Sequence, residues 1–468
     1  TSQVTAASAV VTFNDAKNVE ITAKELSDVG AAVTSASIAT AVKVSGTHDQ
    51  LTAAFVTTTS KVTAASAKVT FSDDTGTDMT AKEISDIVGE VGSGTITNRV
   101  DITGNKTEMT AALVTNGTAA TIGTTGTTAT VSDLASLSEA NAIAKINNVT
   151  ASFTLGLSDT AGNLTKDATT ISDDMAAVTT DQSDIKITVS DAKDESVDAT
   201  RLSAIGGTTT GLVTVSNAIK VSAGHDDLLA AFVTTTSKVT AAKAVVTFSD
   251  AKNTEITAKQ LGDVGGAVAS ASVTNKIKVD GSHDELTSAF VSTTSKVTAA
   301  SAVVTFNDAK NVEITAKELS DVGAAVTSAS IATAVKVSGT HDQLTAAFVT
   351  TTSKVTAASA KVTFSDDTGT DMTAKEISDI VGEVGSGTIT NRVDITGNKT
   401  EMTAALVTNG TAATIGTTGT TATVSDLASL SEANAIAKIN NVTASFTLGL
   451  SDTAGNLTKD ATTISDDM

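Results

Sequence analysis

The segment AVVTFNDAKNVEITAKEL, residues 9–26, holds in order the parts of the unit from which this chain is built. Residues 9–13 are apolar or β-branched and predict a strand, and the Asn- and Asp-containing residues 14–18 predict a turn. Val19, Glu20 and Ile21 alternate in polarity and predict a second, shorter extended piece. The segment therefore predicts two extended pieces separated by a turn.

A helix is expected directly after these extended pieces. Thr22 and Glu25 form a capping box, in which a hydroxyl and an acidic side chain three residues later satisfy the free amides of a helix start. Leu26 and Val29 follow at helical spacing. Because glycine favours the position just after a helix, we expect the helix to end at Gly30.

The next residues repeat this plan with different letters. Residues 41–44 predict a strand, Ser45-Gly46 a turn, and Thr47 with Gln50 a second capping box. The capping pattern persists where residue types change: Thr80 with Glu83, Asn105 with Glu108, Thr257 with Gln260, Ser282 with Glu285, Thr315 with Glu318 and Thr373 with Glu376. Asp198 stands at the equivalent place without an acidic partner. Retained chemistry with changed residues supports real helix starts.

The chain is a tandem array. Residues 4–175 recur identically as residues 297–468, and the strings VTAASAVVTF, VTAASAKVTF and VTAAKAVVTF mark a shorter period at 4–13, 62–71 and 239–248. A perfect copy of this length indicates recent duplication. We predict eight repeats: 4–61, 62–118, 119–175, 176–238, 239–296, 297–354 (a copy of the first), 355–411 (a copy of the second) and 412–468 (a copy of the third).

Each predicted half-repeat is too short to bury a core of its own, so neighbouring halves must cover one another. We therefore predict an α/β repeat solenoid, in which short parallel strands stack into a continuous ladder with short capped helices on one side. The lack of proline suits such a ladder, since proline removes a hydrogen-bond donor. Tandem small β-rich domains are the alternative. The solenoid is preferred because no linker-like spacer separates the repeats.

The composition excludes several classes of function. The chain has no Cys, Pro, Trp or Tyr, and a formal net charge of −21 at pH 7. Without cysteine it has no disulfide or thiolate metal site. Strong negative charge repels nucleic acid and anionic membranes and favours cations. No apolar run is long enough to span a bilayer, so we expect no membrane insertion and no nucleic-acid partner.

The four histidines, His48, His225, His283 and His341, each precede an Asp at a predicted helix start. A row of metal or proton-transfer sites is one interpretation. The interpretation that we favour is a structural first helical position that recurs because the repeat recurs, since several repeats contain no histidine. No histidine lies near a serine in a recognisable catalytic motif.

Acidic turns are the better candidate for a cation site. Ser72–Asp78 contains three carboxylates around a glycine bend, and it recurs as Ser365–Asp371. Carboxylates at a bend suit a hard cation such as calcium, although the pattern is not an EF-hand loop and Asp and Gly also simply form turns. The candidate calcium ligands are Asp73, Asp74, Asp78, Asp366, Asp367 and Asp371. No cofactor is required, and calcium is the candidate cation.

The chain resembles the giant tandem-repeat surface proteins of bacteria, such as those of cyanobacteria and marine proteobacteria. The resemblance is carried by the strand–turn–helix cadence, by SDTAGNL at 158–164 and by TAKEL at 22–26. It covers the whole chain and is compositional. It implies an extracellular, cell-surface location and a role in adhesion, sheath or fibre formation, and it transfers no catalytic residue.

These observations predict a structural protein and not an enzyme. The first hypothesis is an extracellular surface fibre, sheath or filament formed by stacking and self-association of the repeats. The alternative is a rigid spacer or stalk of a giant adhesin whose ligand-binding tip lies outside this segment. A distinct five-repeat superperiod favours the first, because a spacer does not need one.

Overall fold

The computed structural model of the chain describes residues 7–59, 62–64, 66–236, 239–295, 297–352, 355–357 and 359–458. The described residues form two compact units. Unit 1 runs up to Val221 and includes Ala230–Ala244, and unit 2 comprises Ser222–Leu229 and the chain from Val245 onward. Several predicted repeat boundaries lie outside the described residues, namely Val4, Lys61, Lys238, Lys296, Lys354 and Met468.

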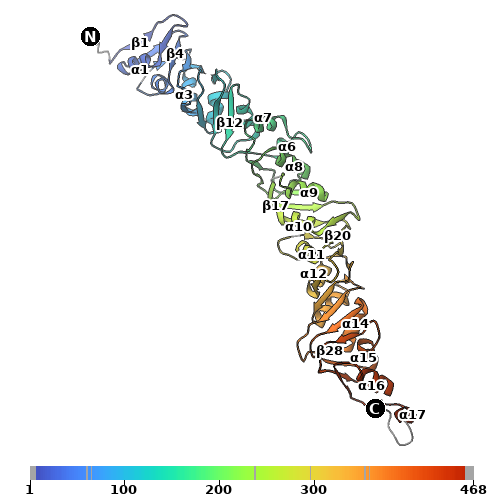
Figure 1. Ribbon diagram of the computed structural model, residues 1–468. Coiled ribbons are helices and arrows are strands. Elements are labelled where there is room, and N and C mark those ends of the chain that lie inside the picture. Colours follow the sequence, from blue (N-terminus) through green and yellow to red (C-terminus); the bar gives the residue numbers. More distant parts are fainter. Residues whose placement is uncertain are drawn as a thin grey trace. The chain divides into compact units, whose positions relative to one another are not determined.

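The helices are short and follow one another at regular intervals (Figure 1). They are α1 (Ala23–Ala32), α2 (His48–Phe55), α3 (Ala81–Val91), α4 (Lys106–Met109) continued by a π-helical turn (Thr110–Val114), α5 (Leu137–Ala144), α6 (Ala161–Leu164), α7 (Asp173–Asp181), α8 (Ala199–Thr208), α9 (His225–Phe232), α10 (Ala258–Ala267), α11 (His283–Phe290), α12 (Ala316–Ala325), α13 (His341–Phe348), α14 (Ala374–Val384), α15 (Lys399–Leu406), α16 (Leu430–Ala437) and α17 (Ala454–Leu457).

The strands up to Val215 belong to unit 1. They are β1 (Val10–Phe13), β2 (Glu20–Thr22), β3 (Ser35–Ile38), β4 (Lys43–Gly46), β5 (Val62–Thr63), β6 (Lys68–Phe71), β7 (Asp78–Thr80), β8 (Ser93–Ile96), β9 (Asp101–Gly104), β10 (Ala120–Ile122), β11 (Thr127–Val131), β12 (Val149–Phe153), β13 (Leu157–Asp159), β14 (Ile187–Val189) and β15 (Val213–Val215). After them come β16 (Lys220–Ala223) and β17 (Val239–Phe248).

The remaining strands belong to unit 2. They are β18 (Glu255–Thr257), β19 (Val268–Val273), β20 (Lys278–Gly281), β21 (Val297–Thr298), β22 (Val303–Phe306), β23 (Glu313–Thr315), β24 (Ser328–Ile331), β25 (Lys336–Gly339), β26 (Val355–Thr356), β27 (Lys361–Phe364), β28 (Asp371–Thr373), β29 (Ser386–Ile389), β30 (Asp394–Gly397), β31 (Ala413–Ile415), β32 (Thr420–Val424) and β33 (Val442–Phe446).

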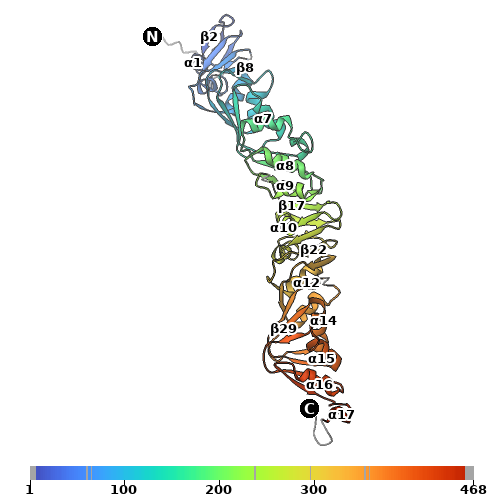
Figure 2. The same cartoon turned by 45° about the vertical axis from the view of Figure 1, so that its right-hand side comes forward.

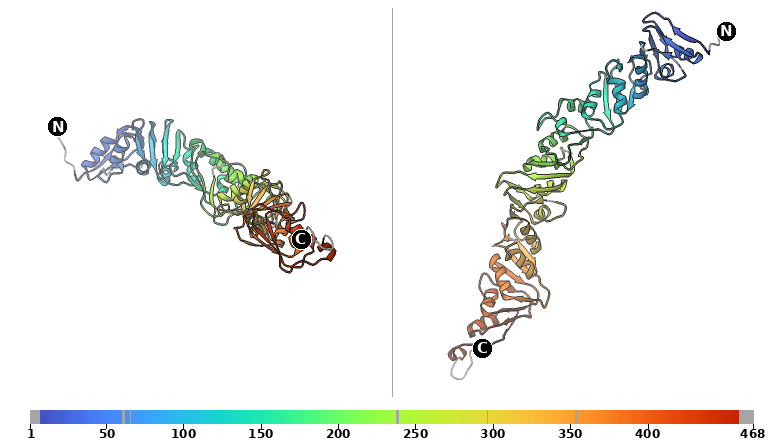
Figure 3. Two further views of the ribbon diagram at one scale, coloured as in Figure 1. Left: turned by 60° about the horizontal axis from the view of Figure 1, so that its bottom comes forward. Right: turned by 180° about the vertical axis from the view of Figure 1, so that it is seen from behind.

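The fold is α/β, and the strands pair in parallel across successive turns of the chain. Val10 pairs with Ser35 and Lys43 pairs with Lys68, in both cases 25 residues further along. We call the stretch from one ladder strand to the next a coil. In each coil a helix connects the strands to those of the following coil. The helices of successive coils pack on each other, as α1 does on α2 and α12 on α13. The strands of unit 1 lie side by side in the left-hand view of Figure 3.

The strands form several ladders in place of the single ladder that the sequence predicted. In unit 1, β2-β4-β6-β8-β10 form one ladder and β7-β9-β11-β12 form another. Adjacent strands lie about 4.8 Å apart, whereas packed helices need about 8–10 Å. A stack with one helix in each coil cannot satisfy both spacings in a straight line.

In unit 2, the helices α12, α14, α15 and α16 can be followed in Figure 2.

The capping boxes are confirmed. At Thr22, Thr47, Thr80 and Asn105, the side chain accepts from the amide three residues on, and that residue's side chain accepts from the capping residue's own amide. The expected cap at Asp198 is only partly confirmed. Asp198 occupies the capping position of α8 without a capping hydrogen bond, because its carboxylate pairs with Arg201 at 3.3 Å.

Two glycine predictions are wrong. The helix α1 continues past Gly30 to Ala32, and β4 includes Ser45 and Gly46, which had been assigned to a turn. The equivalent of Gly30 in α10 is Gly265, where a Cβ would collide with the Ser295 carbonyl oxygen of the next coil. Gly265 therefore permits close packing between coils and does not end α10.

Burial of a coil depends on the coil before it. Val10–Phe13 and Val303–Phe306 have the same sequence, yet Val11 and Phe13 are half-buried, whereas their counterparts Val304 and Phe306 are fully buried. The strand β22 pairs with β20 on one side and β24 on the other. Among the described residues, β1 pairs only with β3. Strands of identical sequence are therefore buried to different extents, depending on whether a neighbouring coil pairs with them.

The coil that follows matters as well. Phe153 is 1% exposed, while its copy Phe446 is half-buried. The amides of Ala151 and Phe153 donate to Asp181 Oδ2 (2.9 Å) and Gln182 Oε1 (2.7 Å), both at the end of α7. The residues that would be the counterparts of α7 in the second copy lie outside the described chain. A strand within the array is therefore covered from both directions, whereas β1, among the described residues, is covered from one.

The closest approach between helix and strand occurs at a glycine that ends the second strand of a coil. A Cβ at Gly46 would lie 2.6 Å from the Cβ of Ala23, and the pairs Gly104 with Ala81 and Gly281 with Ala258 repeat this contact at 2.7 and 2.6 Å. Both members are small because the first turn of one helix lies directly against the strand of the next coil.

We predict opposite effects for two glycine-to-alanine substitutions. Gly46→Ala should destabilise the chain by about 1–3 kcal/mol, because overpacking forces backbone or rotamer shifts. Gly89→Ala, on the exposed face of α3 with nothing within 4 Å of the new methyl, should stabilise it by up to about 1 kcal/mol. Urea unfolding followed by circular dichroism measures both. Equal midpoints for Gly46→Ala and the unsubstituted chain would contradict this packing.

Candidate functional site

Buried carboxylates lie at the turns after the first strands of the predicted repeats. Asp73, Asp191, Asp250, Asp308 and Asp366 are each 3–9% exposed. A helix start leaves main-chain amides without partners inside the helix. At α2, α6, α9, α11 and α13 the first helical amide receives its acceptor from the next coil, and the acceptor is one of these aspartates.

The geometry is nearly identical at the four histidines. His48 donates its main-chain amide to Asp73 Oδ2 at 3.0 Å, and its ring Nδ1 lies 2.6 Å from Asp73 Oδ1. The same ring contact of 2.6 Å joins His225 to Asp250, His283 to Asp308 and His341 to Asp366. Because an ionised carboxylate can only accept, Nδ1 carries the hydrogen. The expectation that each histidine is the first helical residue is confirmed.

Several coils without histidine keep the carboxylate. The amide of Lys106 donates to Asp133 at 2.7 Å, that of Leu137 to Asp159 at 3.0 Å, and that of Ala161 to Asp191 at 2.7 Å. Hydrogen bonds to ionised groups contribute more than neutral ones, about 1.5–3 kcal/mol each. We call this contact, from a helix's first amide to an aspartate of the next coil, the inter-coil carboxylate link. It ties successive coils together at their helix starts.

Two of the histidine links raise the pKa of their imidazole. Burial lowers the pKa of His283, but the hydrogen bond and negative charge of Asp308 outweigh it, so that the net pKa is raised above the ordinary value. The pKa of His341 is raised in the same way by Asp366, with further contributions from Asp342 and Glu376. The imidazolium forms of His283 and His341 therefore persist to higher pH in the folded chain than in a free histidine.

The six predicted calcium ligands lie in two equivalent turns, and the structure separates them by role. Asp73 and Asp366 are buried in links to His48 and His341. Asp74, Asp78, Asp367 and Asp371 are exposed. In the part of the chain that the structure describes, no close group of ligand atoms includes any of the six. Calcium binding by these turns stays a prediction.

The glycine bend in these turns has a main-chain explanation. Gly76 has φ +83°, and its amide donates to the Arg99 carbonyl of the next coil at 2.8 Å. In the first predicted repeat, Asn18 occupies this place with φ +66° and donates to the Ala41 carbonyl at 3.0 Å. The bend thus serves coil-to-coil pairing in repeats with and without the acidic cluster.

Comparison with known proteins assigns the chain to no family. No protein-family model matches the chain, and no curated protein matches it significantly. Among the described residues, no helix is both long enough and apolar enough to cross a membrane.

We predict that the histidine links make stability depend on pH. Since the folded pKa of His283 and His341 exceeds the unfolded value, their contribution is complete below about pH 6.5 and is lost as pH rises through the raised pKa. The thermal midpoint in chelator-containing buffer should therefore fall between about pH 6 and about pH 8.5.

The double variant His283→Gln, His341→Gln is the control. It keeps both main-chain amide donors and removes both titrating rings, so its midpoint should vary less over the same interval. An unchanged pH dependence in this variant would rule out the histidine links as its source.

Proposed function

We propose that this chain is a structural protein whose coils stack as an α/β solenoid and build an extracellular fibre, sheath or filament at a cell surface. The observation that carries the proposal is the burial of identical segments by neighbouring coils, as at Val304 and Val11. Such nearest-neighbour stability is the property of repeat arrays. Tandem independent domains would bury equal sequences equally.

Self-association follows from the same contacts. The surfaces that join one coil to the next recur along the chain, so two chains that meet end to end can use parallel pairing and inter-coil carboxylate links. Exposed strand edges favour such addition. The net charge of −21 opposes non-specific clumping and leaves specific stacking as the favoured contact.

The extracellular location is proposed from the resemblance to giant tandem-repeat surface proteins. The non-enzymatic role is proposed from the same resemblance and from the structural use of the chain's buried polar side chains. The buried carboxylates and the histidines lie in links between coils. Calcium at the acidic turns is retained as a proposed stabilising cation.

An adhesin stalk is the second candidate. The exact duplication of residues 4–175 favours it, because a spacer gains length by copying and needs no new surface. The two candidates differ in one property: a filament component associates with itself, whereas a stalk stays apart.

We predict that the purified chain forms ordered fibres in negative-stain electron microscopy, with an axial repeat set by the five-repeat superperiod. The grids are compared with and without a calcium chelator. Loss of fibres on chelation would make the Asp turns calcium sites. Isolated rods would favour the adhesin stalk, and beads on a string would overturn the continuous solenoid.

A further inference from the structure

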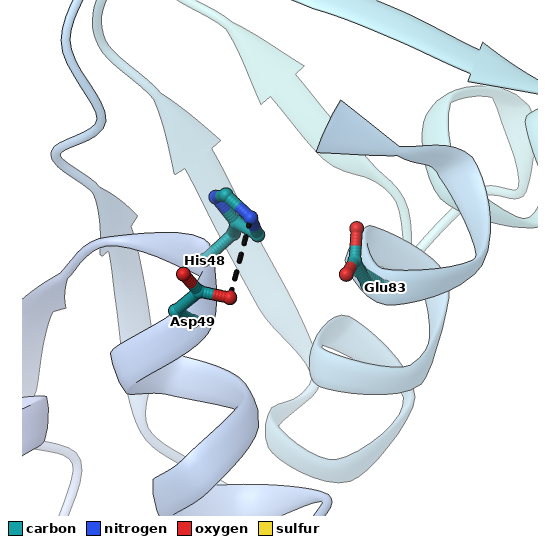
Figure 4. Close-up of side chains that lie close together, drawn as sticks. All are labelled: His48, Asp49 and Glu83. Carbon is teal, nitrogen blue, oxygen red and sulfur yellow. Dashed lines mark ion pairs between the residues drawn. The ribbon is translucent and has the colours of Figure 1, made fainter. Parts of the chain in front are cut away.

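His48 and His283 each carry, beside the ring nitrogen that the inter-coil carboxylate link does not use, a cluster of two further carboxylates. His48 and Asp49 lie on the first turn of α2, and Glu83 faces them from the first turn of α3 (Figure 4). One ligand atom from each of the three residues lies within 4.8 Å of the other two. The same arrangement recurs at His283, Asp284 and Glu318.

The imidazole is oriented as metal-binding imidazoles are. Its Nδ1 is held by the buried Asp73 at 2.6 Å, which leaves Nε2 to face Asp49 Oδ1 at 3.5 Å. Metal-ligating histidines usually donate their other ring N–H to a carboxylate, which fixes the tautomer and raises the basicity of the ligating nitrogen. The inter-coil link therefore supplies the outer shell of a metal site.

The spacing of the ligand atoms also fits. Metal–ligand bonds of about 2.0–2.1 Å in a tetrahedral site place ligand atoms about 3.3 Å apart, close to the observed separation of Nε2 and Asp49 Oδ1. Capping hydrogen bonds from Thr80 go to Glu83 Oε2, so Oε1 is the oxygen left for a metal. The His48 side chain is 14% exposed and that of Asp49 is 86% exposed, so an ion can enter from solvent.

The charges are matched to a divalent ion. Two carboxylates balance a dication, and an imidazole nitrogen favours the first-row transition metals over calcium and magnesium. Three protein ligands leave a fourth tetrahedral position for water.

We propose that His48, Asp49 and Glu83 bind a divalent first-row transition-metal ion such as Zn²⁺. His283, Asp284 and Glu318 form a second such site. His341, Asp342 and Glu376 repeat the first set in sequence, and His341 Nε2 lies 3.5 Å from Asp342 Oδ1, but among the described residues only the first two sets bring all three ligand atoms within 4.8 Å of one another. The bound ion ties the helix at the end of one predicted repeat to the first helix of the next.

The chain contains its own natural variant of this site. His225 and Asp226 keep the 3.3 Å contact, but the position of Glu83 is taken by Gln260. Gln260 still forms a complete capping box with Thr257. A Glu-to-Gln change at this position therefore removes a metal ligand while the helix start survives.

This variant defines the experiment. The metal-stripped 468-residue chain and the triple variant Glu83→Gln, Glu318→Gln, Glu376→Gln are titrated calorimetrically with Zn²⁺. The unsubstituted chain should bind at least two ions in a saturable manner, and the triple variant should bind them at least about tenfold more weakly. Glu25→Gln, in a capping box without a preceding histidine, is the matched control and should bind like the unsubstituted chain.

Two further measurements separate the alternatives. Circular dichroism checks that the triple variant is folded, and the visible absorption of Co²⁺ reports tetrahedral coordination. Absence of saturable Zn²⁺ binding, equal binding by the triple variant, or displacement of Zn²⁺ by excess Ca²⁺ would each overturn the proposal. A selective loss at one site in Asp308→Asn, by roughly 10–100-fold, would support the assigned outer shell.

Discussion

The coil cannot fold alone, and every other feature of this chain follows from that constraint. Successive ladder positions are 25 residues apart at Val10 and Ser35, a length too short to enclose a core. Each coil therefore obtains burial from its neighbours, and several helix starts obtain a hydrogen-bond acceptor from the next coil. The inter-coil carboxylate link contributes to both. It gives the free amide of a helix start an acceptor, and it holds the next coil against that helix.

The sequence predicted local features well. Capping boxes could be located because the two interacting side chains lie within four residues of each other, as Thr22 and Glu25 do. The strand β3, Ser35–Ile38, was missed because its SASI sequence lacks the β-branched alternation of a strand. It is extended because it pairs with β1. The role of Gly265 was also non-local, since the Ser295 carbonyl that excludes a Cβ lies in another coil.

In the candidate sites, too, the local features could be predicted from the sequence and the non-local contacts could not. The position of His48 at the first turn of a helix could be predicted, but its partner Asp73 lies 25 residues away and no local pattern names it. One signal was present in the sequence: all four histidines are followed by an aspartate at that same spacing. The acidic turn at Asp73–Asp78 drew attention as a cluster, whereas the structure gives Asp73 a partner of its own and leaves Asp74 and Asp78 exposed.

The most direct test of coil-to-coil dependence uses the identical strands β1 and β22. The chain has no cysteine, so Val11→Cys and Val304→Cys each introduce a single thiol in the same local sequence. The rate of reaction with a thiol reagent reports access. Because β20 covers β22, we expect Val304→Cys to react at least about tenfold more slowly, the factor that corresponds to 1.4 kcal/mol of local opening. Equal rates at the two positions would contradict the account.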